Sequence, residues 1–87
     1  MKVAIALTKV NEQNGLTSKL AEPVIAEVAD FEELQAGLQQ KYGECTGLIM
    51  DNDQPERATG WVFRSKQGYP GNWWHVSIWA EVLGVKD

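Results

Sequence analysis

Large apolar and small or polar side chains alternate at the start of the chain. The large apolar residues occupy every second position: Val3, Ile5 and Leu7. This period of two predicts a half-buried β-strand. A second alternating segment occupies residues 23–29, and between the two lies Asn14-Gly15, a pair that favours a type I′ hairpin turn. The pattern predicts an antiparallel ribbon whose paired residue numbers sum to 29, with a bulge or a frayed tip around residues 9–21.

The next apolar residues follow a helical period. They recur at three- and four-residue spacing, as on one face of a helix: Phe31, Leu34, Leu38 and Tyr42. Asp30 and Glu33 form a variant of the capping box that starts a helix, and Gly43 suits the left-handed residue that ends one. Gly37 costs up to about 1 kcal/mol relative to Ala, which suggests that the helix lies close to a sheet there.

Three further strand-like segments complete the chain: TGLIM, GWVFRSK and GNWWHVSIWAEV. Because no second helical pattern follows, the element order is ββαβββ. This order predicts an α+β fold for a single compact domain, residues 1–87, with one mostly antiparallel sheet and a single helix packed on one face. The expected core consists of Ile5, Val24, Phe31, Leu34, Leu38, Trp61, Phe63, Trp74, Val76 and Ile78.

The last segment carries tryptophans on both faces of its predicted strand. Pairing Phe63 with Trp74, so that residue numbers sum to 137, keeps Arg64 and Lys66 out of the core. This register predicts Trp61 opposite Val76. The outer face of the hairpin then carries Val62, Arg64, Lys66, Trp73, His75, Ser77 and Trp79.

This outer face is the candidate site, with Trp73, His75 and Trp79 at its centre and Arg64, Lys66 and Ser77 around them. One interpretation is a second small core covered by the Asn11–Ala21 ribbon or the Gln67–Gly71 loop of the same chain. Another is contact with a second copy or a protein partner, since Trp and Arg are enriched at interfaces. A small-ligand pocket, in which His75 titrates and the indoles stack, is a third. A fourth interpretation is a surface that binds single-stranded nucleic acid.

Composition narrows these alternatives. Eight basic and twelve acidic residues give a net charge of −4, which disfavours nucleic acid and anionic membranes. No apolar segment approaches the length of a membrane span. So short a chain also benefits from association with a second copy. We interpret the chain as a non-enzymatic binding or assembly module that forms a homodimer or binds a protein partner.

Motifs for catalysis, metal binding or cofactor binding are absent from the sequence. One cysteine and one histidine cannot complete a four-ligand zinc site, and the stretch after Asp51 lacks the glycine of a calcium-binding loop. A nucleophilic Cys45–His75 pair is formally available, but nothing in the pattern brings the two together. We therefore predict no catalytic residues, no metal and no cofactor. The start, MKVAIALTKV, lacks the small-residue cleavage site of a signal peptide, and with no membrane-spanning segment we expect a cytoplasmic location.

Overall fold

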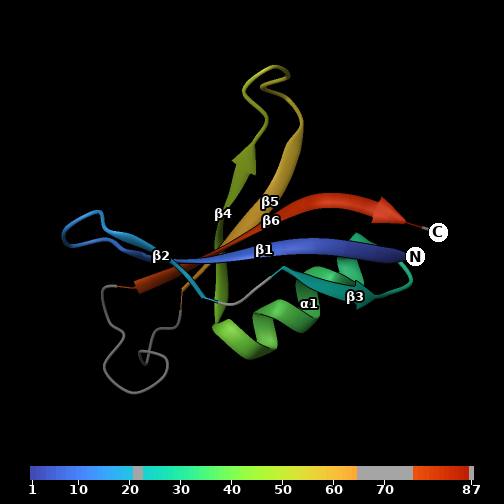
Figure 1. Cartoon of the computed structure of the whole chain (residues 1–87), viewed down its shortest axis with the longest axis horizontal. Coiled ribbons are helices and arrows are strands. Elements are labelled where there is room, and N and C mark those ends of the chain that lie inside the picture. Colours follow the sequence, from blue (N-terminus) through green and yellow to red (C-terminus); the bar gives the residue numbers. More distant parts are fainter. Residues whose placement is uncertain (21–22, 65–75, 87) are drawn as a thin grey trace.

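A computed structural model of the chain describes residues 1–20, 23–64 and 76–86. Within these residues the structure has six strands and one helix. They are β1 (Lys2–Asn11), β2 (Thr17–Lys19), β3 (Val24–Glu27), α1 (Phe31–Tyr42), β4 (Glu44–Met50), β5 (Ala58–Arg64) and β6 (Val76–Lys86) (Figure 1). All strand pairs are antiparallel, in the order β2-β1-β6-β5-β4, and β3 also pairs with β1. The predicted α+β fold, with one antiparallel sheet and one helix, is confirmed.

The first ribbon has the predicted register near its base. Lys2 pairs with Glu27 and Ile5 with Val24, so these residue numbers sum to 29. Toward the tip the sum falls to 27, as in the pair Thr8–Lys19. The register therefore changes by two residues between β3 and β2, which both pair with β1. The segment predicted as one strand forms two strands, and the predicted ββαβββ order becomes βββαβββ.

The predicted type I′ turn is wrong. A five-residue loop, 12–16, joins β1 to β2, and Asn11 N donates to Leu16 O (2.9 Å) at its base. Gly15 has a φ of 73°, whereas Asn14 does not have a positive φ. The Asn14 side chain instead accepts a hydrogen bond from Leu16 N at 2.9 Å. This side-chain acceptor supports the wider loop.

The helix begins and ends where the sequence predicts. Asp30 Oδ1 accepts from Glu33 N (2.8 Å), and Glu33 Oε2 accepts from Ala29 N (2.7 Å), which completes the capping box. Gly43 ends the helix with a φ of 116°. The explanation offered for Gly37 is wrong, because a Cβ at this position would meet nothing within 4 Å.

The predicted register between β5 and β6 is wrong by four residues. Trp61 pairs with Ala80 rather than Val76, and Phe63 pairs with Ile78, so the residue numbers sum to 141. The predicted partner of Phe63, Trp74, lies outside the described residues. Since four is an even number, the shift leaves each side chain of β5 on its predicted face.

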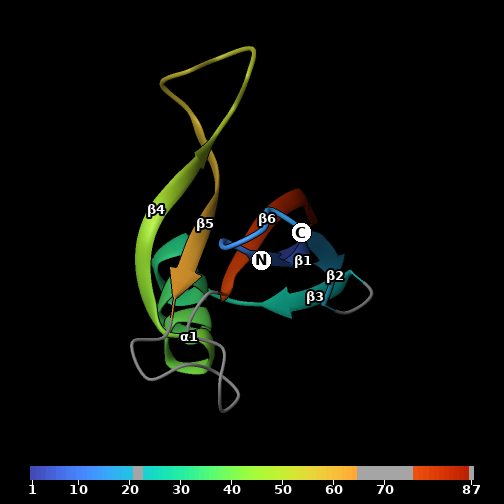
Figure 2. The same ribbon diagram turned by 90° about the vertical axis from the view of Figure 1, so that its left-hand side faces the viewer.

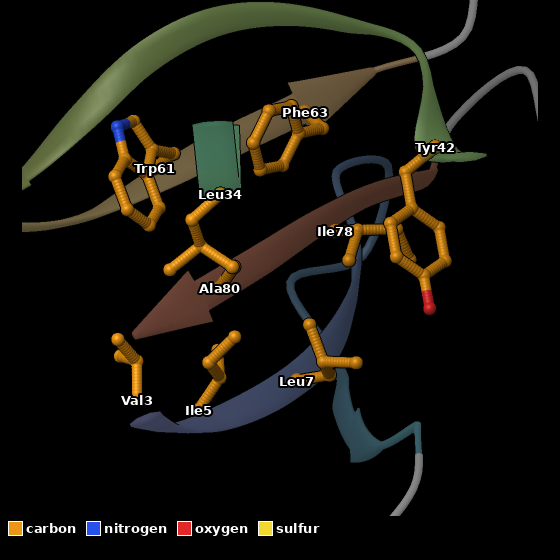
Figure 3. Close-up of a cluster of buried hydrophobic side chains, with 9 residues drawn as sticks. All are labelled: Val3, Ile5, Leu7, Leu34, Tyr42, Trp61, Phe63, Ile78 and Ala80. Atoms are coloured by element: carbon orange, nitrogen blue, oxygen red, sulfur yellow. The ribbon is translucent and has the colours of Figure 1, made fainter. Parts of the chain in front are cut away.

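The core lies between the helix and the middle of the sheet. Its buried members are Val3, Ile5, Leu7, Leu34, Tyr42, Trp61, Phe63, Ile78 and Ala80 (Figure 3). Leu38 and Val76 are partly buried against it. Two core predictions are wrong, because Phe31 is 43% exposed and Val24 is 42% exposed. Val24 is exposed because α1 lies nearest β4 and β5 and leaves β3 uncovered (Figure 2). The ring of Phe31 lies 6.4 Å from that of Trp61, and both residues line an opening at the surface.

Among the described residues, the one helix has 12 residues and is neither long enough nor apolar enough to cross a membrane.

Candidate functional site

Trp79 lies in the middle of the sheet, on the face that the helix does not cover. Its neighbours along β6, Ile78 and Ala80, point into the core beneath the helix, so the intervening side chain points the other way. Thr8 of β1 and Val62 of β5 flank it on the two adjacent strands. The Trp79 side chain keeps 40% of its surface exposed. We call this side of the sheet, with Thr8, Val62, Ser77 and Trp79, the outer face.

Ser77 holds the indole of Trp79 in place. Trp79 Nε1 donates to Ser77 Oγ at 3.3 Å, and Ser77 is only 1% exposed. A side chain this deeply buried is not positioned to contact a partner itself. Its hydroxyl satisfies the indole N–H and thereby favours one orientation of the ring.

A shallow depression of about 230 Å³ lies beside the indole. It is lined by Thr8, Val10, Thr17, Trp79 and Glu81. Thr17 belongs to β2, so the β1–β2 ribbon borders the indole on one side. The ribbon does not seal the ring from solvent, because Trp79 remains 40% exposed.

Arg64 lies at the end of β5 and forms an ion pair with the loop between β1 and β2. Its Nη1 is 3.0 Å from Glu12 Oε2, and the two side chains are 45% and 40% exposed. At this exposure the pair contributes little to stability. It does place a cation and an anion side by side at the rim of the outer face.

Three of the predicted site residues, Lys66, Trp73 and His75, lie outside the described residues. Because His75 is one of them, the Cys45–His75 pair also lies outside the described residues. Of the other three, Ser77 and Trp79 are in contact, and Arg64 marks the edge of the same face.

Cys45 is one of the described residues. Cys45 is partly buried and its Sγ lies 3.4 Å from Gly47 O, within hydrogen-bonding distance for a thiol. Across the described ranges, no group of three or more His, Cys, Asp or Glu side chains is placed to hold a metal ion.

The structure also contains a cleft that the sequence did not predict. The pairing of β5 with β6 ends at Gly60–Glu81, while β6 continues along β1 as far as Lys86. In Figure 1 the β4–β5 hairpin turns away from β1 and β6 beyond this point. The opening has a volume of about 590 Å³, and its lining includes Phe31, Trp61, Leu83 and Val85. It was missed because the predicted last strand ended at Val82. The alternation of Leu83 and Val85 was the available signal.

Comparison with family models, with curated proteins and with solved structures finds no match to this chain.

Proposed function

We propose that this chain is a non-enzymatic binding or assembly module that contacts another protein chain, a second copy included, through its outer face. The observation that carries this proposal is Trp79. It is a half-exposed indole in the sheet's interior strand, on the face opposite the helix. A tryptophan buries on the order of 200 Å² when covered, so its contact with a partner stabilises a complex strongly.

The surroundings of Trp79 resemble the anatomy of a protein interface. The centre is aromatic and aliphatic and consists of Trp79, Val62 and Val10. Polar side chains surround it, namely Thr8, Thr17, Glu81 and the Glu12–Arg64 ion pair. Interfaces commonly combine an apolar centre with a polar rim. The hydrogen bond to Ser77 restricts the indole before binding, which lowers the entropic cost of association. In this proposal Trp73, His75 and Lys66 extend the same surface.

The shape of the outer face favours a protein partner over a small ligand. Small-molecule sites are usually concave, with volumes of about 300–1,000 Å³ that enclose most of the ligand. The depression beside Trp79 has about 230 Å³ and is open to solvent. A shallow, open surface with one half-exposed indole suits contact with another chain.

The test compares Trp79→Ala with Leu48→Ala. Leu48 is 55% exposed but lies on β4, at the edge of the sheet. Both variants are expected to fold, as checked by circular dichroism. In pull-downs and sedimentation, a partner or second copy is expected to bind the wild type and Leu48→Ala. Trp79→Ala should weaken that contact about tenfold or more.

Equal binding of a partner chain to Trp79→Ala and to the wild type in pull-downs would contradict the proposal. So would a wild-type chain that stays monomeric and retains no protein. The proposal includes a cytoplasmic location, which cell fractionation tests separately.

A further inference from the structure

A second surface lies on the helix side of the sheet, away from the outer face. An apolar groove of about 240 Å³ runs between α1 and the β1–β3 part of the sheet. Ile5, Val24, Ala26, Leu34 and Leu38 belong to its walls. Val24 is 42% exposed because α1 lies nearest the opposite half of the sheet.

Gly37 opens the middle of the helix wall of this groove. Glycine is a poor helix former, and a Cβ at position 37 would meet nothing within 4 Å. Packing within the chain therefore does not require a glycine here. What its absent side chain does permit is the close approach of a second backbone to α1.

Two opposite charges are placed symmetrically about Gly37. Glu33 lies four residues before it and Lys41 four residues after it, and all three line the groove. Positions four apart lie on one ridge of a helix. The Lys41 ammonium lies 5.4 Å from the Tyr42 ring centroid, and within the described residues it forms no ion pair.

We propose that two copies of this chain associate through antiparallel α1 helices that cross at Gly37. A two-fold axis at this position brings Glu33 of each copy next to Lys41 of the second copy. A parallel arrangement would instead place like charges together. Each helix then covers the open groove of the other copy, where the aliphatic stem of Lys41 packs on apolar side chains such as Val24. This contact goes beyond the proposed function, because it leaves Trp79 free for another partner.

The charge symmetry provides a direct test by sedimentation velocity. Lys41→Glu places two pairs of like negative charges across the axis, and Glu33→Lys places two pairs of like positive charges. Each variant alone is expected to dissociate at least about tenfold more readily than the wild type. An equimolar mixture is expected to form a heterodimer, because both cross-axis pairs are then of opposite charge.

Two controls separate the interface from the fold. Gln39→Glu makes a charge change in the same turn as Lys41, but Gln39 does not line the groove, so this variant is expected to dimerise like the wild type. Glu33→Lys also loses the hydrogen bond to Ala29 N, so circular dichroism must show that it is folded. Gly37→Gln is expected to raise the Tm of the monomer, measured at low protein concentration, because it restores a helix former in open space. At higher concentration it is expected to weaken dimerisation.

Several outcomes would overturn this inference. One is a wild-type chain that stays monomeric at all concentrations up to hundreds of micromolar. Another is a Lys41→Glu variant that dimerises as tightly as the wild type. A third is a mixture of Lys41→Glu with Glu33→Lys that does not associate. A dimer lost in Trp79→Ala but kept in Lys41→Glu would also overturn it, while supporting the proposal for the outer face.

Discussion

Gly60 is the position where a single added carbon is expected to do the most damage. It lies in β5 opposite Glu81, and its backbone passes directly against β6. A Cβ on Gly60 would collide with the Ala80 carbonyl oxygen and lie 2.9 Å from Glu81 Cα. These are backbone atoms of an interior strand, so they cannot rotate away. We expect Gly60→Ala to lower the free energy of unfolding by about 2–3 kcal/mol or more in urea denaturation.

The matched control is Gly47→Ala in the adjacent strand β4. A Cβ there would meet nothing within 4 Å, and Gly47 does not have a positive φ. The change also reduces the entropy of the unfolded chain, so it is expected to alter stability by less than about 1 kcal/mol. Similar losses in the two variants would show that the close contact between β5 and β6 does not exist.

At the scale of the element, the stability of α1 depends on the hydrogen bonds of its first turn. Asp30 Oδ1 accepts the hydrogen bond from Glu33 N and so satisfies a backbone donor that has no partner inside the helix. Asp30→Ala is expected to cost about 1 kcal/mol, seen as a lower urea midpoint of the signal at 222 nm. Glu32→Gln, in the same turn but outside the capping box, should cost less. A larger loss in Glu32→Gln would mean that the general charge of the first turn matters more than the cap.

The same element shows why some of the fold is predictable from sequence. Every signal for α1 is local: the capping residues, the apolar period and Gly43 lie within fourteen positions of one another. Alternation along β5 and β6 is also local, but it determines only which face a side chain occupies. It does not distinguish registers that differ by an even number of residues. The actual register depends also on β1, which pairs with the other edge of β6 and was not predicted as its neighbour.

The features of the candidate site also divide into those that follow from local sequence pattern and those that depend on packing in three dimensions. The outward direction of Trp79 follows from alternation, so the sequence was sufficient to predict it. The burial of Ser77 depends on what lies over it in three dimensions. The exposure of Val24 depends on where along the sheet the helix rests. The groove at Gly37 depends on that same position, so local pattern was not enough to predict it.

At the scale of the whole molecule, the first and last strands form the centre of the sheet. β1 and β6 share ten residue pairs, the longest pairing among the described strands. Both also pair with strands on their other edges, β1 with β2 and β3 and β6 with β5. They supply five of the nine buried core residues: Val3, Ile5, Leu7, Ile78 and Ala80. Folding of this unit therefore requires contact between the two ends of the described chain, a non-local topology that slows folding.

This arrangement predicts the order of amide hydrogen exchange. Amides in the paired middle of β1 and β6 are expected to exchange most slowly, because opening them requires disruption of the core. Those of β2, a three-residue strand whose side chains are all exposed, should exchange fastest among the strands. Exchange measured by NMR at single-residue resolution checks both ends of this order. Slower exchange in the β4–β5 hairpin than in β1 and β6 would place the stable unit in the local hairpin. The long pairing of the two ends would then form last and contribute least.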